Sequence, residues 1–338
     1  MGLRSTKCRD RTDLEWRCKQ KKTWNFLPDV SWTCTISVER CQCLPSNSLL
    51  REHVSVQYAE QGGDSLIPEG NLLSNIDRFT GFADGYDRNR PQAPQFVTRI
   101  LRDYLGHRPA RVADVGCGTG LSTFIWKDAA DQIIGVEPSP DMLTLAKHKL
   151  ALYTDAPHIS FEQGYSNTLP LPSSSVDIIT CSQSFHWMEP TSTLKEAGRV
   201  LREGGIFAAY DCEWPPCANW HIETAYMDIL DHASDIIHRL ADPQNRPLKL
   251  DKSAHLRRLE ESHVFRYTRE IGFHHTEIAD ADRYIGLVLS QGGVQTVFKL
   301  GSKELDQKLI RFAALVQDYF QGRTLEVVFS YRMRLGMK

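Results

Sequence analysis

The stretch Val112–Leu121 reads VADVGCGTGL, an apolar strand-like run that enters a turn with glycines at positions 116, 118 and 120. Glycine allows a sharp turn and lets a ligand approach the main chain closely. The spacing is Gly-x-Gly-x-Gly, whereas the dinucleotide-binding fingerprint is Gly-x-Gly-x-x-Gly. Asp114 stands two residues before the first glycine, and a carboxylate there suits a cationic ammonium group and opposes a pyrophosphate. The stretch therefore predicts a site for a cofactor that carries an amino acid.

Strand and helix patterns alternate regularly from this stretch onward. The expected strands are 111–116, 132–137, 159–163, 176–181 and 206–211, and the expected helices between them are 121–130, 140–152 and 191–201. A helix at 96–105 precedes them, and the elements that follow are a strand at 264–277, helices at 280–290 and 304–320 and a last strand at 324–335. Because strands that alternate with helices form parallel βαβ units, we expect an α/β fold with a Rossmann-like doubly wound sheet.

The chain divides by composition into an extension and one domain. Residues 1–70 hold five of the nine cysteines, show no sustained period and contain no Cys spacing typical of zinc, so we predict a poorly ordered extension. Residues 71–338 form the expected domain. Its parts are a cofactor-binding core (71–212), a helical lid or substrate insertion (213–263) and strands and helices that complete the sheet (264–338).

Composition and charge limit the classes of function. The 338 residues are 41% hydrophobic and 24% charged, with a net charge of -2, which is ordinary for a globular protein and lacks the basic footprint of a nucleic-acid partner. No apolar run is long enough for a membrane span, and the polar amino terminus does not resemble a secretory signal. The odd number of cysteines argues against a disulfide framework. We therefore expect a cytoplasmic protein without a membrane partner.

An acid at the end of the second expected strand completes the motif. Glu137 follows Gly120 by seventeen positions, and a carboxylate at that place accepts hydrogen bonds from a ribose diol. In Asp114–Gly120 and Glu137–Ser139 the chain resembles the class I S-adenosylmethionine-dependent methyltransferases, over about residues 77–211. The runs SQSFHW at 182–187 and LREGG at 201–205 make it similar, more narrowly, to the small-molecule branch of type 11 and trans-aconitate methyltransferase-like proteins.

The resemblance implies a seven-stranded sheet with an antiparallel last strand, and S-adenosyl-L-methionine as the cofactor. The sequence departs from the family after the third strand, where no carboxylate follows Gly164. We therefore expect backbone groups of Tyr165 and Ser166 to contact the edge of the adenine. The expected cofactor-binding residues are Asp114, Gly116, Cys117, Gly118, Gly120, Glu137, Pro138, Met142, Tyr165, Ser166 and Gln183.

Two residues are candidates for catalysis. His186 follows the fourth strand, at the carboxyl end of the sheet, where it is a possible substrate contact or general base; a histidine packed beside Trp187 is the alternative. Tyr86 lies in the segment that folds over the cofactor in the family, with plain packing as its alternative. Trp214, Trp220 and Tyr226 line an apolar pocket or form the core of the lid. His274 and His275 face opposite sides of a strand, so we expect no metal site.

The sequence thus predicts O-methylation of a carboxylate or hydroxyl on a small-molecule acceptor, by a monomer or homodimer. One alternative is a catalytically degenerate cofactor-binding module that acts through a protein partner. An oxidoreductase lacks its glycine spacing, and a nucleic-acid methyltransferase lacks a basic chain and an Asn/Asp-Pro-Pro-Tyr type sequence after the fourth strand.

Overall fold

The computed structural model describes residues 21–27, 31–37, 67–78, 80–243 and 246–338. The chain forms two compact units, Met1–Gly63 and Asp64–Lys338. In the first unit, β1 (Lys21–Leu27) pairs antiparallel with β2 (Ser31–Ser37). The sequence predicted no strand there. The rest of the predicted extension up to residue 66 lies outside the described residues.

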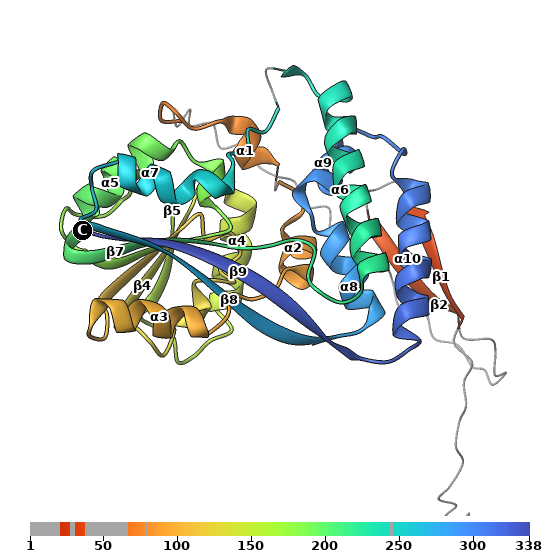
Figure 1. Cartoon of the computed structure of the whole chain (residues 1–338), viewed down its shortest axis with the longest axis horizontal. Coiled ribbons are helices and arrows are strands. Elements are labelled where there is room, and N and C mark those ends of the chain that lie inside the picture. The colour runs from red at the N-terminus through yellow and green to blue at the C-terminus, as the bar shows by residue number, and fades with distance from the viewer. Residues whose placement is uncertain (1–20, 28–30, 38–66, 79, 244–245) are drawn as a thin grey trace, which may run out of the picture. The chain divides into compact units, whose positions relative to one another are not determined.

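The second unit is built on one seven-stranded sheet with the order β5-β4-β3-β6-β7-β9-β8 (Figure 1). Its strands are β3 (Arg111–Val115), β4 (Gln132–Glu137), β5 (Ile159–Gln163), β6 (Val176–Ser182), β7 (Leu201–Cys212), β8 (Tyr267–Ala279) and β9 (Leu325–Met337). The first five strands in this order are parallel, and β9 runs antiparallel between β7 and β8. The expected doubly wound, seven-stranded sheet with an antiparallel last strand is confirmed.

The central strands are apolar on both faces, which buries the sheet between two layers of helices. Val112 packs in one core cluster with residues of α3 (Phe96–Leu105), whereas its neighbour Ala113 packs in another with residues of α5 (Pro190–Val200). Figure 1 shows α3 on one side of the sheet and α5 on the other. Because side chains of a strand alternate between faces, both layers are anchored by the same strands.

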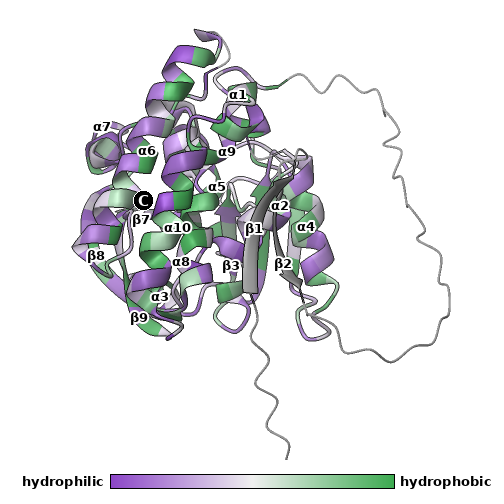
Figure 2. Ribbon diagram, turned by 90° about the vertical axis from the view of Figure 1, so that its right-hand side faces the viewer, coloured by the Kyte–Doolittle hydropathy of each residue, from purple (hydrophilic) through white to green (hydrophobic). Residues whose placement is uncertain are grey.

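The remaining helices are α1 (Leu73–Asp77), α2 (Ala83–Asn89), α4 (Pro140–Leu150), α6 (Trp220–Leu240), α7 (His255–Glu261), α8 (Ala281–Leu289), α9 (Gly292–Lys299) and α10 (Asp306–Phe320). Helices α6, α8, α9 and α10 gather beyond the sheet (Figure 1) and share a separate hydrophobic cluster. Figure 2 shows hydrophobic and hydrophilic residues along α6 and α10, as expected of amphipathic helices. Among the helices described, none has an apolar run that could cross a bilayer.

Two local predictions were wrong. The helix expected at 121–130 is only a 3-10 turn, Phe124–Trp126, because the hydroxyls of Ser122 and Thr123 bond to the carboxylate of Asp114 and draw this segment against β3. The run Glu203-Gly204-Gly205 predicts a turn before the strand expected at 206–211, but these residues lie inside β7, where the pairing with β6 shifts register and Gly204 has a φ of 77°. In the predicted insertion, α6 packs with α9 and α10, whereas α7 packs against β8 and β9.

Candidate functional site

The glycine turn after β3 has the backbone that its sequence predicts. Gly116 and Gly118 have φ values of 68° and 56°, a region that favours glycine. A Cβ on Gly116 would lie 2.7 Å from the Cβ of Ser184, so the turn passes close to the segment after β6. A Cβ on Gly118 would meet nothing within 4 Å. The turn therefore presents the main chain of Gly118 to open space.

Glu137 holds this turn from the end of β4. Its Oε2 accepts a hydrogen bond from the Gly118 N–H at 2.8 Å, and its Oε1 accepts one from the Ser139 N–H at 2.9 Å. Burial raises the pKa of Glu137 to about 7, against the lowering effect of these two N–H donors, and Asp114 raises it further. A carboxylate has about four lone-pair sites, so Glu137 retains acceptor capacity for hydroxyls of a ligand.

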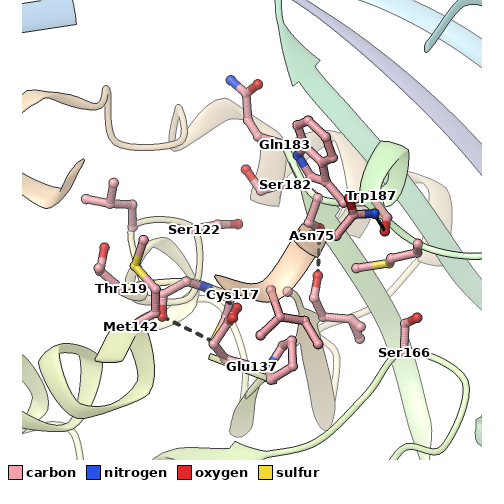
Figure 3. Close-up of a pocket in the computed structure, with 18 of the residues that line it drawn as sticks. Asn75, Cys117, Thr119, Ser122, Glu137, Met142, Ser166, Ser182, Gln183 and Trp187 are labelled. Carbon is pink, nitrogen blue, oxygen red and sulfur yellow. Dashed lines mark hydrogen bonds between the residues drawn. The ribbon is translucent and has the colours of Figure 1, made fainter. Parts of the chain in front are cut away.

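One cavity collects most of the predicted cofactor residues at the carboxyl ends of the strands (Figure 3). Figure 3 shows Glu137, Cys117 and Met142 on the side of the glycine turn, with Gln183 and Trp187 contributed by the segment after β6. The predicted residues that line this cavity are Tyr86, Gly116, Cys117, Gly118, Glu137, Pro138, Met142, Tyr165, Ser166 and Gln183. This is the place where ligands bind in open α/β sheets.

Asp114 and Gly120 are not among the described residues that line the cavity. Asp114 is fully buried, and its carboxylate accepts hydrogen bonds from Thr123 at 2.7 Å, Thr180 at 2.8 Å and Ser122 at 3.3 Å. Burial raises the pKa of Asp114 to about 6, although the three hydroxyls oppose that shift. The carboxylate joins β3, β6 and the segment after the glycine turn. Its contact with an ammonium group stays a prediction.

Several lining residues had no signal in the sequence. Asn75, in α1, donates hydrogen bonds to the carbonyls of Trp187 at 2.9 Å and Leu248 at 3.1 Å and accepts one from the Leu248 N–H at 2.9 Å. It therefore fastens α1 to two distant segments at the rim of the cavity. Neither periodicity nor a motif marks it. The other unpredicted lining residues include Asn71, Leu72, Ile76, Arg90, Thr119, Ser122, Ser182, Ser184, Met188 and Tyr331.

His186 lines a second cavity, which shares Tyr86, Arg90, Gln183 and Trp187 with the first. Its Nδ1 lies 3.2 Å from Oδ1 of Asp211, and both side chains are buried. Burial lowers the pKa of His186 to about 3, and the nearby Lys252 lowers it too, whereas Asp211 raises it. His186 is therefore a neutral imidazole near pH 7.

The three aromatic residues expected near the lid have different positions. Trp214 lines the second cavity. Tyr226 is fully buried in the core of the helical cluster, where its hydroxyl accepts a hydrogen bond from Gln291 at 2.7 Å. Trp220 is 68% exposed and stacks on His221. Of the three residues, one thus lines a cavity, one belongs to the helical core and one lies at the surface.

His186, Asp211 and His255 place potential metal-ligating atoms within 4.8 Å of one another. Cations surround the group, however. Lys252 Nζ lies 2.8 Å from Asp211 Oδ1, and an Arg258 nitrogen lies 2.9 Å from His255 Nδ1. Asp211 is the single carboxylate of this group, and it already forms an ion pair with Lys252, which makes the group a poor site for a divalent cation. We therefore interpret these residues as part of a buried network of charged groups.

Comparison with known proteins shows that part of the chain is similar to methyltransferases. Residues 113–209 match the family model of a methyltransferase domain. An uncharacterized methyltransferase of Mycobacterium tuberculosis is 32% identical over 165 residues, which are 49% of this chain and 60% of the relative. A demethylmenaquinone methyltransferase of Deinococcus radiodurans is 38% identical over 158 residues, 46% of this chain and 59% of the relative. The chain thus spans about three fifths of the length of these curated relatives.

A solved structure supports the fold over a larger part of the chain. A protein of Anaeromyxobacter dehalogenans, described as a type II methyltransferase, superposes with a TM-score of 0.54 at 19% identity. The match covers 73% of this chain and 97% of the other. The structural match therefore extends well beyond the segment that matches the family model.

Proposed function

We propose that this chain transfers a methyl group from S-adenosylmethionine to a small-molecule acceptor, because residues 113–209 match the model of a methyltransferase domain and the fold resembles that of a solved structure described as a methyltransferase. The observation that carries the proposal is the first cavity, in which Glu137 and the open main chain of Gly118 face the same space. The second cavity adjoins it through shared residues and supports a separate place for the acceptor.

The lining residues fit S-adenosylmethionine by their chemistry. Glu137 would accept hydrogen bonds from the ribose hydroxyls, and Pro138 and Met142 offer apolar contacts. Tyr165 and Ser166 would hold the adenine edge through backbone groups. When bound, the cofactor supplies a methyl group on a sulfonium, which is a good leaving group. The main task of the protein is therefore to align the cofactor with the acceptor and to exclude water.

Residues common to the two cavities are suited to that alignment. Tyr86, Gln183 and Trp187 come from two segments far apart in the sequence and contact both spaces. Orienting two reactants in this way lowers a barrier by roughly 7–11 kcal/mol. We therefore assign Tyr86 and Gln183 to positioning of the reactants, which keeps Tyr86 in the site without a proton-transfer role.

The acceptor atom that we favour is a carboxylate oxygen. A carboxylate needs no base, whereas a hydroxyl must lose a proton, and a base works best when its pKa is near the operating pH. Burial holds the pKa of His186 at about 3, which makes it a weak base. With an acceptor in hand, His186→Asn should leave the pH profile of kcat unchanged; loss of activity restored at high pH would support a hydroxyl acceptor instead.

The direct test is calorimetric titration of the full chain with S-adenosylhomocysteine, with NAD as the control ligand. We expect saturable binding of S-adenosylhomocysteine and none of NAD, because the turn has the Gly-x-Gly-x-Gly spacing. If well-folded protein binds neither ligand, the proposal is wrong and the degenerate module that acts through a protein partner becomes the better explanation.

The pH dependence of this binding is a second expectation. Burial raises the pKa of Glu137 to about 7, and ribose hydroxyls donate better to the ionised form. Binding therefore lowers this pKa, and affinity should rise about tenfold from pH 6 to pH 8 by proton linkage. Calorimetry at the two pH values measures it. Glu137→Gln cannot ionise and should bind weakly with no such dependence; an equal pH effect in that variant would assign it to another group.

A further inference from the structure

The second cavity is lined by four basic side chains from three segments of the chain. Arg78 follows α1, Arg90 follows α2, and Lys249 and Lys252 belong to the segment before α7. Within residues 67–78, 80–243 and 246–338, no aspartate or glutamate lines this cavity. His186 adds no charge near pH 7, since burial lowers its pKa to about 3. The lining that the structure describes is therefore cationic.

A buried acid, Asp211, forms an ion pair with one of these cations. Asp211 Oδ1 lies 2.8 Å from Lys252 Nζ, and its other oxygen lies 3.9 Å from an Arg334 nitrogen. Asp211 thus offsets the charge of Lys252 and stands behind the lining, next to His186. Arg90 and Lys249 also line the cavity, and no described acid forms an ion pair with either of them.

Arg90 is held in position by neutral partners. Its guanidinium lies 4.6 Å from the ring centroid of Trp214 and 5.3 Å from that of Tyr86. One of its terminal nitrogens donates to the Ser290 carbonyl and to Gln291 Oε1, both at 3.2 Å. Its Nε is buried and has no hydrogen-bond partner among the described residues. A guanidinium has five N–H donors in a planar fork, so Arg90 keeps capacity for a planar or tetrahedral anion.

The side of the second cavity that α9 forms also favours an anion. The Arg78 guanidinium stacks over the Trp187 ring at 3.6 Å, and a Cβ on Gly292 would lie 1.9 Å from its terminal nitrogen. Glycine at this first position of α9 therefore leaves room for Arg78. Gly292 and Gly293 also line the cavity, so the amino end of α9, where the helix dipole is positive, adds to the attraction for an anion.

The cations that line this cavity repel one another. The pKa of Lys249 is lowered to about 8, first by desolvation and then by Lys252 and Arg78, although much of the residue is exposed. The pKa of Arg78 is lowered to about 9, first by desolvation and then by Arg90. Such clustering costs free energy unless a counter-charge is present. A bound anion would supply that charge.

We propose that this cavity binds an acidic group of the methyl acceptor, a carboxylate or a phosphate, through Arg90, Lys249 and Arg78. The inference rests on the proposed function and narrows its substrate class to acidic small molecules. The acidic group lies on the side of Arg78 and Lys249, which line only the second cavity, because the atom that receives the methyl group must reach the residues shared with the first cavity, Arg90 among them. The apolar side chains of Trp214, Leu230 and Ile237 line the same cavity and would contact the carbon skeleton.

The test uses the full chain saturated with S-adenosylhomocysteine and titrated at constant ionic strength with succinate, with inorganic phosphate and with neutral succinamide. We expect the wild-type protein to bind succinate or phosphate, and not succinamide. Arg90→Gln and Lys249→Gln should each weaken anion binding about tenfold or more, because each removes a charge-assisted hydrogen bond. Arg99→Gln and Lys303→Gln, at exposed positions outside both cavities, are the matched controls and should bind as the wild type does.

The outcomes separate this inference from the function on which it rests. Preference for succinate or for phosphate identifies the acidic group. Failure of the wild type to bind either anion while it binds S-adenosylhomocysteine would overturn the inference and leave the methyltransferase proposal standing. Equal losses in the control variants would also overturn it, since they would indicate general charge attraction. Lys249 is exposed at the surface, so we expect Lys249→Gln to fold. This variant therefore tests the anion site even if Arg90→Gln does not fold.

Discussion

Glu137→Ala is expected to lower the affinity for S-adenosylhomocysteine at least about 100-fold. The reason is that the variant removes the acceptor for ribose hydroxyls, and hydrogen bonds to a charged group contribute about 1.5–3 kcal/mol each. It also removes the acceptor of the Gly118 N–H, which shapes the turn beside the ligand. Because two effects act on the same cavity, this is the largest loss of binding that we expect from one substitution.

The control for this prediction is a glutamate on the neighbouring strand. Glu162, on β5, is exposed and does not line the cavity, so Glu162→Ala should bind as the wild type does. Circular dichroism and thermal unfolding would establish that Glu137→Ala is folded. If the folded variant binds within about threefold of the wild type, Glu137 has no direct contact with the ligand and the assignment of the cavity is wrong.

Asp114→Ala should lower the free energy of unfolding by about 3–5 kcal/mol, because buried donors left without an acceptor cost about 1–3 kcal/mol each. Asp114 is fully buried and accepts hydrogen bonds from Ser122, Thr123 and Thr180. Alanine leaves all three hydroxyls without this acceptor and opens a small void between β3 and β6. Denaturant unfolding of the wild type and the variant measures the difference.

Asp114→Asn distinguishes a structural role from a ligand contact. Asparagine keeps one side-chain oxygen as acceptor, so its stability loss should be well below that of alanine. If Asp114 only holds the turn, the folded asparagine variant retains its affinity for S-adenosylhomocysteine. A large loss of affinity in a stable variant would instead support the ammonium contact predicted from the motif. A stability loss under about 1 kcal/mol for alanine would contradict the hydrogen-bond argument.

The limits of the sequence are clearest in the segment after the glycine turn. The apolar residues of 121–130 favour a helix by pattern, yet Ser122 and Thr123 bond to Asp114 and the segment forms only a 3-10 turn at Phe124–Trp126. Sequence spacing does not reveal that a buried carboxylate competes for those hydroxyls. The same applies to the segment predicted to be a lid, where the pattern did not separate Trp214 in a cavity from Tyr226 in a core.

The sequence by itself determined the parallel sheet, the glycine turn at 116–120 and the position of Glu137 at the end of the strand that follows it. These features depend on residues close together in the chain or on strands whose carboxyl ends must meet at one edge. Only the tertiary structure decided that Asp114 lies beneath the cavity, and that Arg78, Arg90 and Lys249 line one space. The physical reason is that Arg90 and Lys249 lie about 160 residues apart in the sequence and become neighbours only when the helices pack. The local pattern of a helix does not indicate which distant segment it will pack against.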